Sequence, residues 1–466
     1  MLLDSALAYA SANREKQLEE LKTLLRIPSV SVSEEQRLSP DVYEHRADVK
    51  KAAIWLVNAL HRLRMEKVEV RPDHLFVYGE RVTSPHKPTI LFYGHYDVQS
   101  PGSLDAWHSP PFEPIIRGES LYARGAADMK GSLWALLQAV QAITKVGELP
   151  INVKILLEGQ EEIGSPEADG YIAANRDRLR SDVVISLDGG MDKANKPSIV
   201  ISARGCAYYE VEITGPQDDL HSGDFGGVVE NPVHVLCALI AGLHDKNGRI
   251  ALPGFYDAVV SSDTNVLGST QRSDEEWLAA AKVTQLWGDP DYSTDIRATM
   301  RPSLDVSGIV GGFTGQGLKN IIPNRASAKI GVRLVPNQNP TSVSQEVRDY
   351  LHSHCPQTVT YSLRTLAEIP FAAADQRAPF LDLLRRSLKE SFNVEPHLVR
   401  KAGTEPFTGK LQKSTGAAPV AIGFRLSDSA IHGPNEHQHL PTLFRGIDAL
   451  IRFLIYMGGD TPTSCR

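Results

Sequence analysis

The sequence has 466 residues, of which 42% are hydrophobic and 23% are charged, and its formal net charge at pH 7 is −7. This length favours two or three domains, and the composition is that of an ordinary soluble globular protein. The mild acidity and the lack of a basic run argue against a nucleic-acid partner, and no segment offers the roughly 18 uninterrupted apolar residues of a membrane span. The N-terminal residues lack the basic start of a secretory signal, and the four cysteines show no CxxC spacing. We therefore expect a cytoplasmic protein with free thiols.

Predicted strands and helices alternate over much of the chain. Apolar residues recur at three- and four-residue spacing in 49–63 and 132–146, which predicts two amphipathic helices. Short apolar runs bounded by turn residues predict buried strands at 88–94, 152–159, 182–190 and 418–424. Strands that alternate with helices indicate an α/β fold with a doubly wound, mostly parallel sheet.

The part of the chain from about 205 to 376 has a different pattern. Residues 208–215 and 327–335 alternate between apolar and polar, as strands with one solvated face do, and 342–354 is a predicted helix. We interpret this part as an α+β unit inserted into the α/β domain. The predicted boundaries are 1–204 and 377–466 for the two parts of the main domain and 205–376 for the insertion.

Side chains that can bind metals or carry protons follow each predicted strand of the main domain. Ligands of open α/β sheets bind outside the carboxyl ends of the strands. Another such side chain, Asp128, lies in the loop that opens the 132–146 helix. The others are His95 and Asp97 after the first strand, Glu161 and Glu162 after the second, Asp188 at the end of the third, and His432, His437 and His439 after the fourth.

Each of these groups has an ordinary explanation when it is taken alone. An aspartate before a helix is usually a cap, an aspartate beside two glycines usually forms a turn, and paired glutamates or a histidine-rich loop usually lie on the surface. Their shared position at one edge of one sheet favours a metal site instead. Histidines and carboxylates without cysteine suit a pair of divalent ions, and one of two adjacent glutamates can bind metal while the other activates water.

Five motifs resemble those of the co-catalytic metallopeptidases. They are GHYDVQ, ARGAADMKG, EGQEEIGS, LDGG and HGPNE, in this order along the chain. That family contains carnosinases, cytosolic non-specific dipeptidases, aminoacylases and glutamate carboxypeptidases. The segments DLHSGDFGG (219–227) and GVRLVPNQ (331–338) are similar to its dipeptidase–carnosinase branch in particular.

The resemblance implies a dinuclear metal centre. His95 and Asp188 would bind one ion, Glu162 and His432 would bind the other, and Asp128 would bridge the two. Zinc is the first expectation, with manganese or cobalt possible. The residues themselves do not favour His432 over the two later histidines of its loop; only the similarity of HGPNE does so.

The resemblance also implies roles for the two remaining acidic residues. Glu161 would be the general base, and Asp97, which would not itself bind metal, would orient the His95 ring. The peptide bond between Asp128 and Met129 is cis in members of the family, and we expect the same here.

Substrate contacts are implied by the resemblance as well. The inserted unit would be a lid that also forms a homodimer, and His221 would reach the active site of the partner chain to stabilise an oxyanion. Arg333, Asn320, Gly403 and Thr404 would contact the substrate, with Arg333 and Gly403 at its carboxylate. The segment VRKAGTEPFTG (399–409) departs from the Arg-Glu-Gly-Gly-Ser run of the branch, because Thr404 replaces the serine.

The sequence thus predicts a hydrolase that cleaves the amide bond of dipeptides or similar small substrates with a free carboxylate. An N-acyl-amino-acid deacylase or a glutamate carboxypeptidase would use the same metal site. A non-catalytic binding protein on this fold is the alternative of another class, although none of the expected ligands is missing. A nicotinamide-dependent oxidoreductase is disfavoured, since GGFTGQG (311–317) has neither the GxGxxG spacing nor a position after a first strand.

Overall fold

The computed structural model describes residues 1–31, 46–71, 75–191, 193–259, 272–417 and 419–459. The chain forms two compact units. The first unit contains Met1–Ser202, Ala373–Val399 and Pro406–Arg466, and the second contains Ala203–Ala372 and Arg400–Glu405. The predicted boundaries differ from these by a few residues. They also placed residues 400–405 in the main domain, whereas these residues belong to the second unit.

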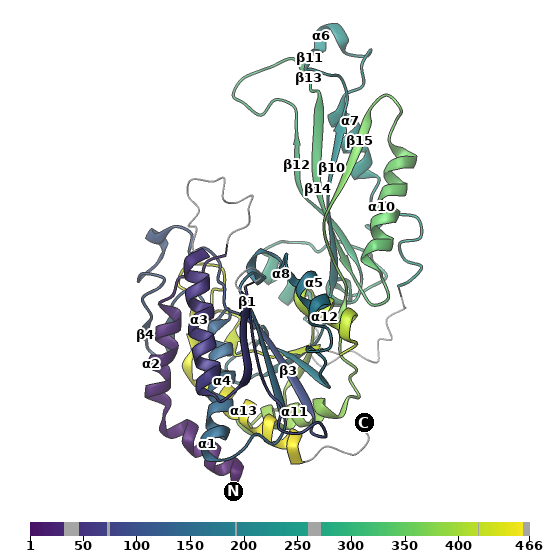
Figure 1. Cartoon of the computed structure of the whole chain (residues 1–466). Coiled ribbons are helices and arrows are strands. Elements are labelled where there is room, and N and C mark those ends of the chain that lie inside the picture. Colours follow the sequence, from purple (N-terminus) through teal and green to yellow (C-terminus); the bar gives the residue numbers. More distant parts are fainter. Residues whose placement is uncertain (32–45, 72–74, 192, 260–271, 418, 460–466) are drawn as a thin grey trace. The chain divides into compact units, whose positions relative to one another are not determined.

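The first unit is built on a nine-stranded sheet (Figure 1). Its order is β1-β2-β6-β3-β7-β18-β9-β16, with β17 paired to β9. The four central strands β6, β3, β7 and β18 are parallel, and antiparallel pairs flank them on both sides. The predicted α/β fold with a mostly parallel sheet is confirmed. The strands are β1 Glu66–Arg71, β2 Phe76–Arg81, β3 Thr89–His95, β6 Asn152–Glu158, β7 Val183–Ser186, β9 Ser198–Ala203, β16 Ala372–Ala373, β17 His397–Lys401 and β18 Pro419–Ala421.

Both faces of this sheet are buried. Ile90 and Phe92 of β3 belong to the larger hydrophobic core, whereas Leu91 and Tyr93 belong to a smaller one. Successive residues of a strand point to opposite faces, so the two cores lie on the two sides of the sheet. This arrangement explains why the central strands read in the sequence as uninterrupted apolar runs.

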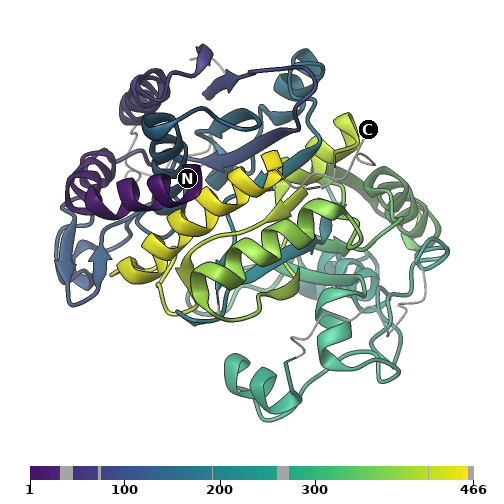
Figure 2. The same ribbon diagram turned by 90° about the horizontal axis from the view of Figure 1, so that it is seen from below.

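Helices cover the two faces. On the larger core, α4 is buried along most of its length and packs against α1 and α13, and α13 packs in turn against α11 (Figure 2). On the smaller core, α5 and α12 supply apolar side chains, and Phe407 of α12 stacks on Tyr93 with ring centroids 4.3 Å apart. The helices of this unit are α1 Leu2–Ala12, α2 Arg14–Leu25, α3 Arg46–Arg62, α4 Lys130–Val146, α5 Ala168–Ala174, α11 Pro379–Phe392, α12 Pro406–Thr415 and α13 Leu440–Gly459. No helix in the described part of the chain is long and apolar enough to cross a membrane.

Short elements complete the first unit next to the parallel strands. β19 pairs in parallel with β8, and β20, β5 and β4 form a small antiparallel sheet. These elements are β4 Ile115–Arg117, β5 Ser120–Tyr122, β8 Gly190–Met191, β19 Arg425–Leu426 and β20 His437–His439, with the 3-10 turns η2 Leu104–Ala106 and η3 Glu161–Ile163.

The second unit contains a four-stranded antiparallel sheet in the order β12-β14-β10-β15. Alternate residues of β10, such as Tyr209 and Val211, face a core that α7 and α10 cover. Both helices begin with an asparagine cap followed by proline, at Asn231 and Asn339. The elements are β10 Gly205–Thr214, β11 Leu220–His221, α6 Ser222–Phe225, α7 Pro232–Ala241, α8 Asp274–Ala281, α9 Thr294–Thr299, β12 Ser303–Gly311, β13 Ile321–Ile322, β14 Arg325–Leu334, α10 Pro340–His354 and β15 Thr360–Ile369.

Candidate metal centre

The carboxyl ends of the parallel strands carry the predicted ligands. β3 ends at His95, and the segments after β6 and β7 carry Glu162 and Asp188. Because β6, β3 and β7 are parallel neighbours, these side chains start from the same edge of the sheet. Asp128 comes from the loop that precedes α4, and His432 from the loop between β19 and β20.

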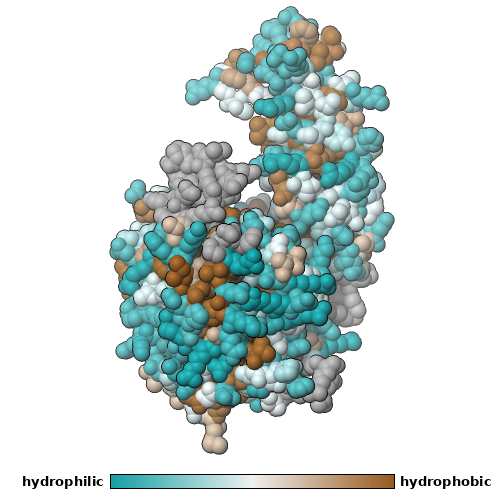
Figure 3. Space-filling view, in the orientation of Figure 1, coloured by the Kyte–Doolittle hydropathy of each residue, from teal (hydrophilic) through white to brown (hydrophobic). Residues whose placement is uncertain are grey.

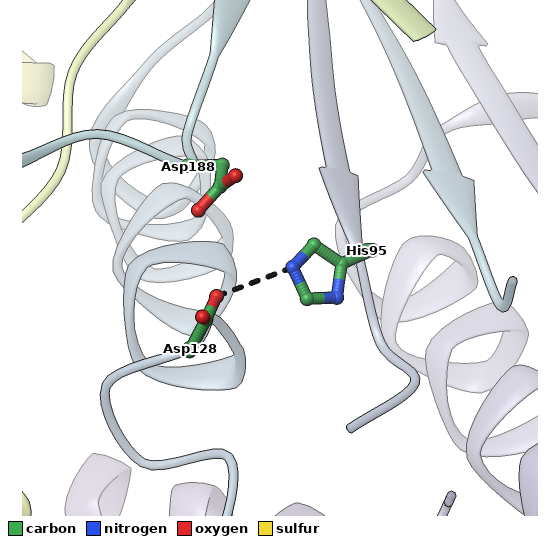
Figure 4. A group of neighbouring side chains, drawn as sticks. All are labelled: His95, Asp128 and Asp188. Atoms are coloured by element: carbon green, nitrogen blue, oxygen red, sulfur yellow. Dashed lines mark ion pairs between the residues drawn. The ribbon is translucent and has the colours of Figure 1, made fainter. Parts of the chain in front are cut away.

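The first group of candidate ligands consists of His95, Asp128 and Asp188 (Figure 4). One ligand atom from each lies within 4.8 Å of the others. His95 Nε2 is 3.3 Å from Asp128 Oδ1, and the His95 side chain is only 1% exposed. The three side chains converge from β3, the α4 loop and the loop after β7, as a single ion would require.

The second group consists of Asp128, Glu162 and His432. His432 Nε2 is 3.2 Å from Asp128 Oδ2 and 3.2 Å from Glu162 Oε2. The Gln99 amide donates to Glu162 Oε2 at 3.0 Å and so fixes this carboxylate. The two groups share Asp128, one through each carboxylate oxygen, as the bridging role implied by the resemblance would require.

The side chains of both groups interact strongly with each other. Burial alone would raise the pKa of Asp128, but Arg425, His432 and His95 outweigh it and hold this pKa well below its usual value. Hydrogen bonds that His432 donates to Asp128 and Glu162 raise the pKa of His432 to about 10. An ion that binds His432 must therefore displace a proton, so metal affinity should fall as the pH is lowered.

The residues present fit a pair of divalent ions. Glu162 Oε1 is buried and has no hydrogen-bond partner within the described part of the chain. A buried carboxylate oxygen without a partner is costly unless a cation binds it. His95 Nδ1 donates to the carbonyl oxygen of Asp97 at 3.0 Å, which leaves Nε2 as the atom that faces the site.

Asp97 has a wider role than the predicted one. Its carboxylate is 3.5 Å from His95 Nδ1, farther away than its own carbonyl oxygen. The same carboxylate accepts hydrogen bonds from the backbone N–H groups of Glu161 and Glu162, at 3.2 and 3.0 Å, and from the Ser31 hydroxyl at 2.6 Å. Asp97 thus fixes the segment that presents both glutamates as well as contacting the His95 ring.

Glu161 lies next to the metal groups but belongs to neither within the described residues. Burial raises the pKa of Glu161 well above its usual value, and nearby Asp188 and Glu162 add to this, while His95 opposes it. A carboxylate with a raised pKa that lies outside both candidate metal groups is suited to accept and return a proton.

The other two histidines of the C-terminal loop lie in different surroundings. His437 stacks on Tyr122 with ring centroids 4.8 Å apart, and its Nδ1 donates to the Asn435 carbonyl. His439 Nδ1 is 2.6 Å from the hydroxyl of Thr442. Only His432 of the three joins a candidate metal group in the described residues.

Two of the predicted substrate residues meet in the second unit. Arg333 of β14 donates to the Thr404 hydroxyl at 2.6 Å. Arg204, only 8% exposed, donates through its backbone N–H to the Gly403 carbonyl at 3.0 Å and through Nε to the Ala402 carbonyl at 2.7 Å. These bonds explain why residues 400–405 belong to the second unit. Burial and, after it, the positive charge of Arg333 lower the pKa of Arg204 to about 10.

His221 and Asn320 lie together elsewhere in the second unit. β11, which contains His221, pairs with β13, and the Asn320 carbonyl accepts the N–H of Ser222 at 3.1 Å. The His221 side chain is 60% exposed, and its Nδ1 accepts the N–H of Gly223 at 3.1 Å. The structure does not bring these two residues to Arg333 within the unit.

The model of peptidase family M20/M25/M40 matches residues 91–456. This chain belongs to that family. It is a metallopeptidase, and the matched segment contains every residue of the two metal groups. The expected resemblance to co-catalytic metallopeptidases is confirmed.

The M20 peptidase is similar to its relatives over nearly its whole length. It is 29% identical to the beta-Ala-His dipeptidase of Homo sapiens, covering 98% of this chain and 93% of the relative. It is 30% identical to the Cys-Gly metallodipeptidase DUG1 of Candida albicans, covering 96% of this chain and 95% of the relative. The solved structure of the M20 family metallo-carboxypeptidase Sso-CP2 from Sulfolobus solfataricus matches it with a TM-score of 0.81 at 30% identity, covering 95% of this chain and 99% of that chain. The two dipeptidases agree with the predicted dipeptidase–carnosinase branch.

Glu436 is a residue of the M20 peptidase site that reasoning from the sequence missed. Its buried carboxylate accepts the backbone N–H groups of Gly125, Ala127 and Asp128, each at 2.9 Å, and the Arg124 guanidinium at 2.6 Å. Glu436 thereby fixes the loop that presents the shared ligand, whose following peptide bond is cis as expected. Its position in HGPNE, four residues after His432, was the only available signal.

Proposed function

We propose that this M20 peptidase hydrolyses the amide bond of dipeptides and similar small substrates that carry a free carboxylate. One observation carries the proposal: two groups of metal-ligand side chains share Asp128, and Glu161 lies beside them outside both groups in the described residues. The beta-Ala-His and Cys-Gly dipeptidases among its relatives support dipeptides as the substrate class.

Two divalent ions per chain would be held by the two groups. Imidazole and carboxylate donors without thiolate suit zinc first, and manganese or cobalt next. When bound, such ions lower the pKa of a water molecule and polarise the scissile carbonyl.

The side chains of the centre divide the remaining work. Glu161 accepts a proton from the attacking water and returns it to the nitrogen of the leaving amine. The Asp97 carboxylate accepts the backbone N–H of Glu161 and so keeps Glu161 in place. A donor is still needed for the oxyanion, and His221 is the proposed one.

The pair Arg333 and Arg204 is the proposed recognition site for the substrate carboxylate. A planar guanidinium can hold a carboxylate through two parallel hydrogen bonds, and the second positive charge strengthens the attraction. The Thr404 hydroxyl, already bonded to Arg333, orients that guanidinium. Thr404 would thus replace the serine of the related branch without loss of a hydroxyl group.

Replacement of Arg333 by methionine should lower kcat/KM for a dipeptide by roughly 10–100-fold, because a hydrogen bond to a charged group contributes about 1.5–3 kcal/mol. The loss should fall mainly on KM, and the preference for a dipeptide over its C-terminal amide should disappear. Arg325, 69% exposed at the other end of β14, offers the matched control Arg325→Met, which should change neither value. Equal discrimination against the amide in wild type and Arg333→Met would contradict the assignment.

The arrangement of the second unit supports a dimer in which His221 serves the partner chain. β14 runs from Arg325, paired with Thr214, to the segment around Arg333, paired with Cys206. Eight residues of strand span roughly 27 Å at about 3.4 Å each. His221 and Asn320 lie beyond the Thr214 end of the sheet, where Figure 1 shows β11, β13 and α6. A dipeptide bound at Arg333 is too short to reach His221 of the same unit, so the histidine would come from a second copy.

Hydrophobic residues on the second unit are consistent with such a dimer. Figure 3 shows them on the surface of the end that carries β11 and β13. Large exposed ones lie on the edge strand β12 and in the following loop, with Val310 68% and Leu318 97% exposed. Exposed apolar side chains on an edge strand favour association with another chain. We propose a second copy of this chain as the partner.

One assay separates the proposed activity from its rivals. Metal-depleted protein is reloaded with zinc, manganese or cobalt and tested on dipeptides, N-acyl amino acids and longer peptides. Fastest turnover of dipeptides supports the proposal, and fastest release of C-terminal residues from longer peptides would favour a carboxypeptidase, for which Sso-CP2 is the precedent. Preference for N-acyl amino acids would indicate a deacylase, and no turnover with any metal would indicate a binding protein.

A further inference from the structure

Arg425 places a permanent positive charge inside the first metal group. β19 pairs with β8 so that Arg425 lies opposite Gly190, two residues after Asp188. A Cβ atom at position 190 would come within 3.2 Å of Arg425 Cγ, so glycine leaves the space through which the side chain reaches the centre. The Arg425 side chain is only 13% exposed.

The guanidinium contacts the two carboxylates of that group. Arg425 Nη1 donates to Asp188 Oδ1 at 2.6 Å and to Asp128 Oδ1 at 3.0 Å. Asp128 Oδ1 is the same oxygen that lies 3.3 Å from His95 Nε2. A single guanidinium nitrogen therefore binds both acidic ligands of the group, and at Asp128 it binds the oxygen that faces the histidine.

The second metal group is arranged differently. It uses the other oxygen of the shared ligand, Asp128 Oδ2, with His432 Nε2 3.2 Å away. An arginine remains charged at any pH at which proteins are folded. The first group must therefore move a cation aside before an ion can use both of its carboxylates.

We propose that the Arg425 guanidinium competes with a divalent ion for Asp128 and Asp188, so that the two ions bind with unequal affinity and the His95–Asp128–Asp188 group fills second. The proposal rests on the two-ion centre of the proposed function. Turnover by this enzyme would then depend on the concentration of free metal, because the centre is complete only when the weaker site is filled. Without that ion, Arg425 keeps the two carboxylates neutralised and in place.

Titration of metal-depleted full-length chain with zinc tests this competition by binding alone. Wild type should bind two zinc ions at two sites of different affinity. Arg425→Met should increase the affinity of the weaker site by about tenfold or more, which is the scale on which residues that contact metal ligands alter affinity. Arg425→Lys keeps a positive charge, so its weaker zinc site should keep the low affinity of wild type. Arg62→Met removes an arginine that pairs with Glu20 elsewhere in the first unit, and should behave as wild type.

A second set of variants, made in the Glu162→Gln chain, identifies the metal group whose affinity changes. In Glu162→Gln the remaining ion is expected in the His95–Asp128–Asp188 group, and adding Arg425→Met should tighten that single ion. The melting temperature gives an independent signal: Arg425→Met should lower it in metal-depleted protein but not in zinc-saturated protein.

The outcomes separate this inference from the proposed function. If wild type and Arg425→Met bind two ions with the same affinities, or if Arg425→Met binds the weaker ion less tightly, the competition is overturned while the two-ion centre stands. If neither chain binds zinc, both fall. If Arg425→Met fails to fold, Arg425→Gln takes its place with the same expected result.

Discussion

Replacement of Glu161 by glutamine should lower kcat on a dipeptide by roughly 10²–10⁴-fold, the usual contribution of a general base, while the chain still binds two ions at saturating zinc. The physical reason is that glutamine keeps the shape of the side chain but cannot accept the proton of the attacking water. Glu161 lies outside both candidate metal groups, so its loss should leave the ligands intact. The measurement is kcat together with the metal content of the same sample by elemental analysis.

The neighbouring variant Glu162→Gln is the matched control. Glu162 belongs to the second group, and its Oε2 lies 3.2 Å from His432. This variant should lose affinity for one ion, and raising the zinc concentration should restore part of its activity. Loss of metal to the same extent in both variants would contradict the separate roles of Glu161 as base and Glu162 as ligand. Normal activity in Glu161→Gln would contradict them as well.

A mixture of His221→Ala chains and Glu161→Gln chains should recover activity that neither variant has alone. Removal of an oxyanion donor costs about 10²–10³-fold, so each variant by itself should be nearly inactive. If His221 serves the partner chain, a mixed dimer has one site with both lesions and one site with neither. After subunit exchange at equal concentrations, mixed dimers form half of the population, and activity should rise to about a quarter of that of wild type.

The opposite outcome is equally clear. If His221 works within its own chain, every site of every dimer keeps one lesion and the mixture stays inactive. Size-exclusion chromatography with light scattering checks that the mixture is dimeric. A monomer at the assay concentration would also contradict the proposal.

The centre of the fold could be predicted from the sequence because its strands are buried on both faces. The run at 88–94 corresponds to β3, and that at 152–159 to β6, each to within a residue or two. β12 and β15 were not predicted. Both have many partly exposed residues, and β12 contains glycines, so neither shows a continuous apolar run.

Motifs at strand ends indicated the candidate metal ligands, but not the contacts that hold them. His95, Asp128 and Asp188 could be predicted to lie together because parallel strands end at one edge. The reach of Arg425 into that group could not, since an arginine in a predicted loop gives no signal of where its long side chain points. Arg204 was missed for a related reason: its bonds to Ala402 and Gly403 join segments about 200 residues apart.

A metal count across four chains tests whether two ions share Asp128. Each chain is depleted, titrated with zinc to the concentration that just saturates wild type, and analysed for bound metal. Two ions are expected for wild type, one each for Asp188→Asn and Glu162→Gln, and close to none for Asp128→Asn, because Asp128 belongs to both groups. Retention of even one ion by Asp128→Asn at wild-type affinity would contradict the shared ligand and, with it, the dinuclear centre.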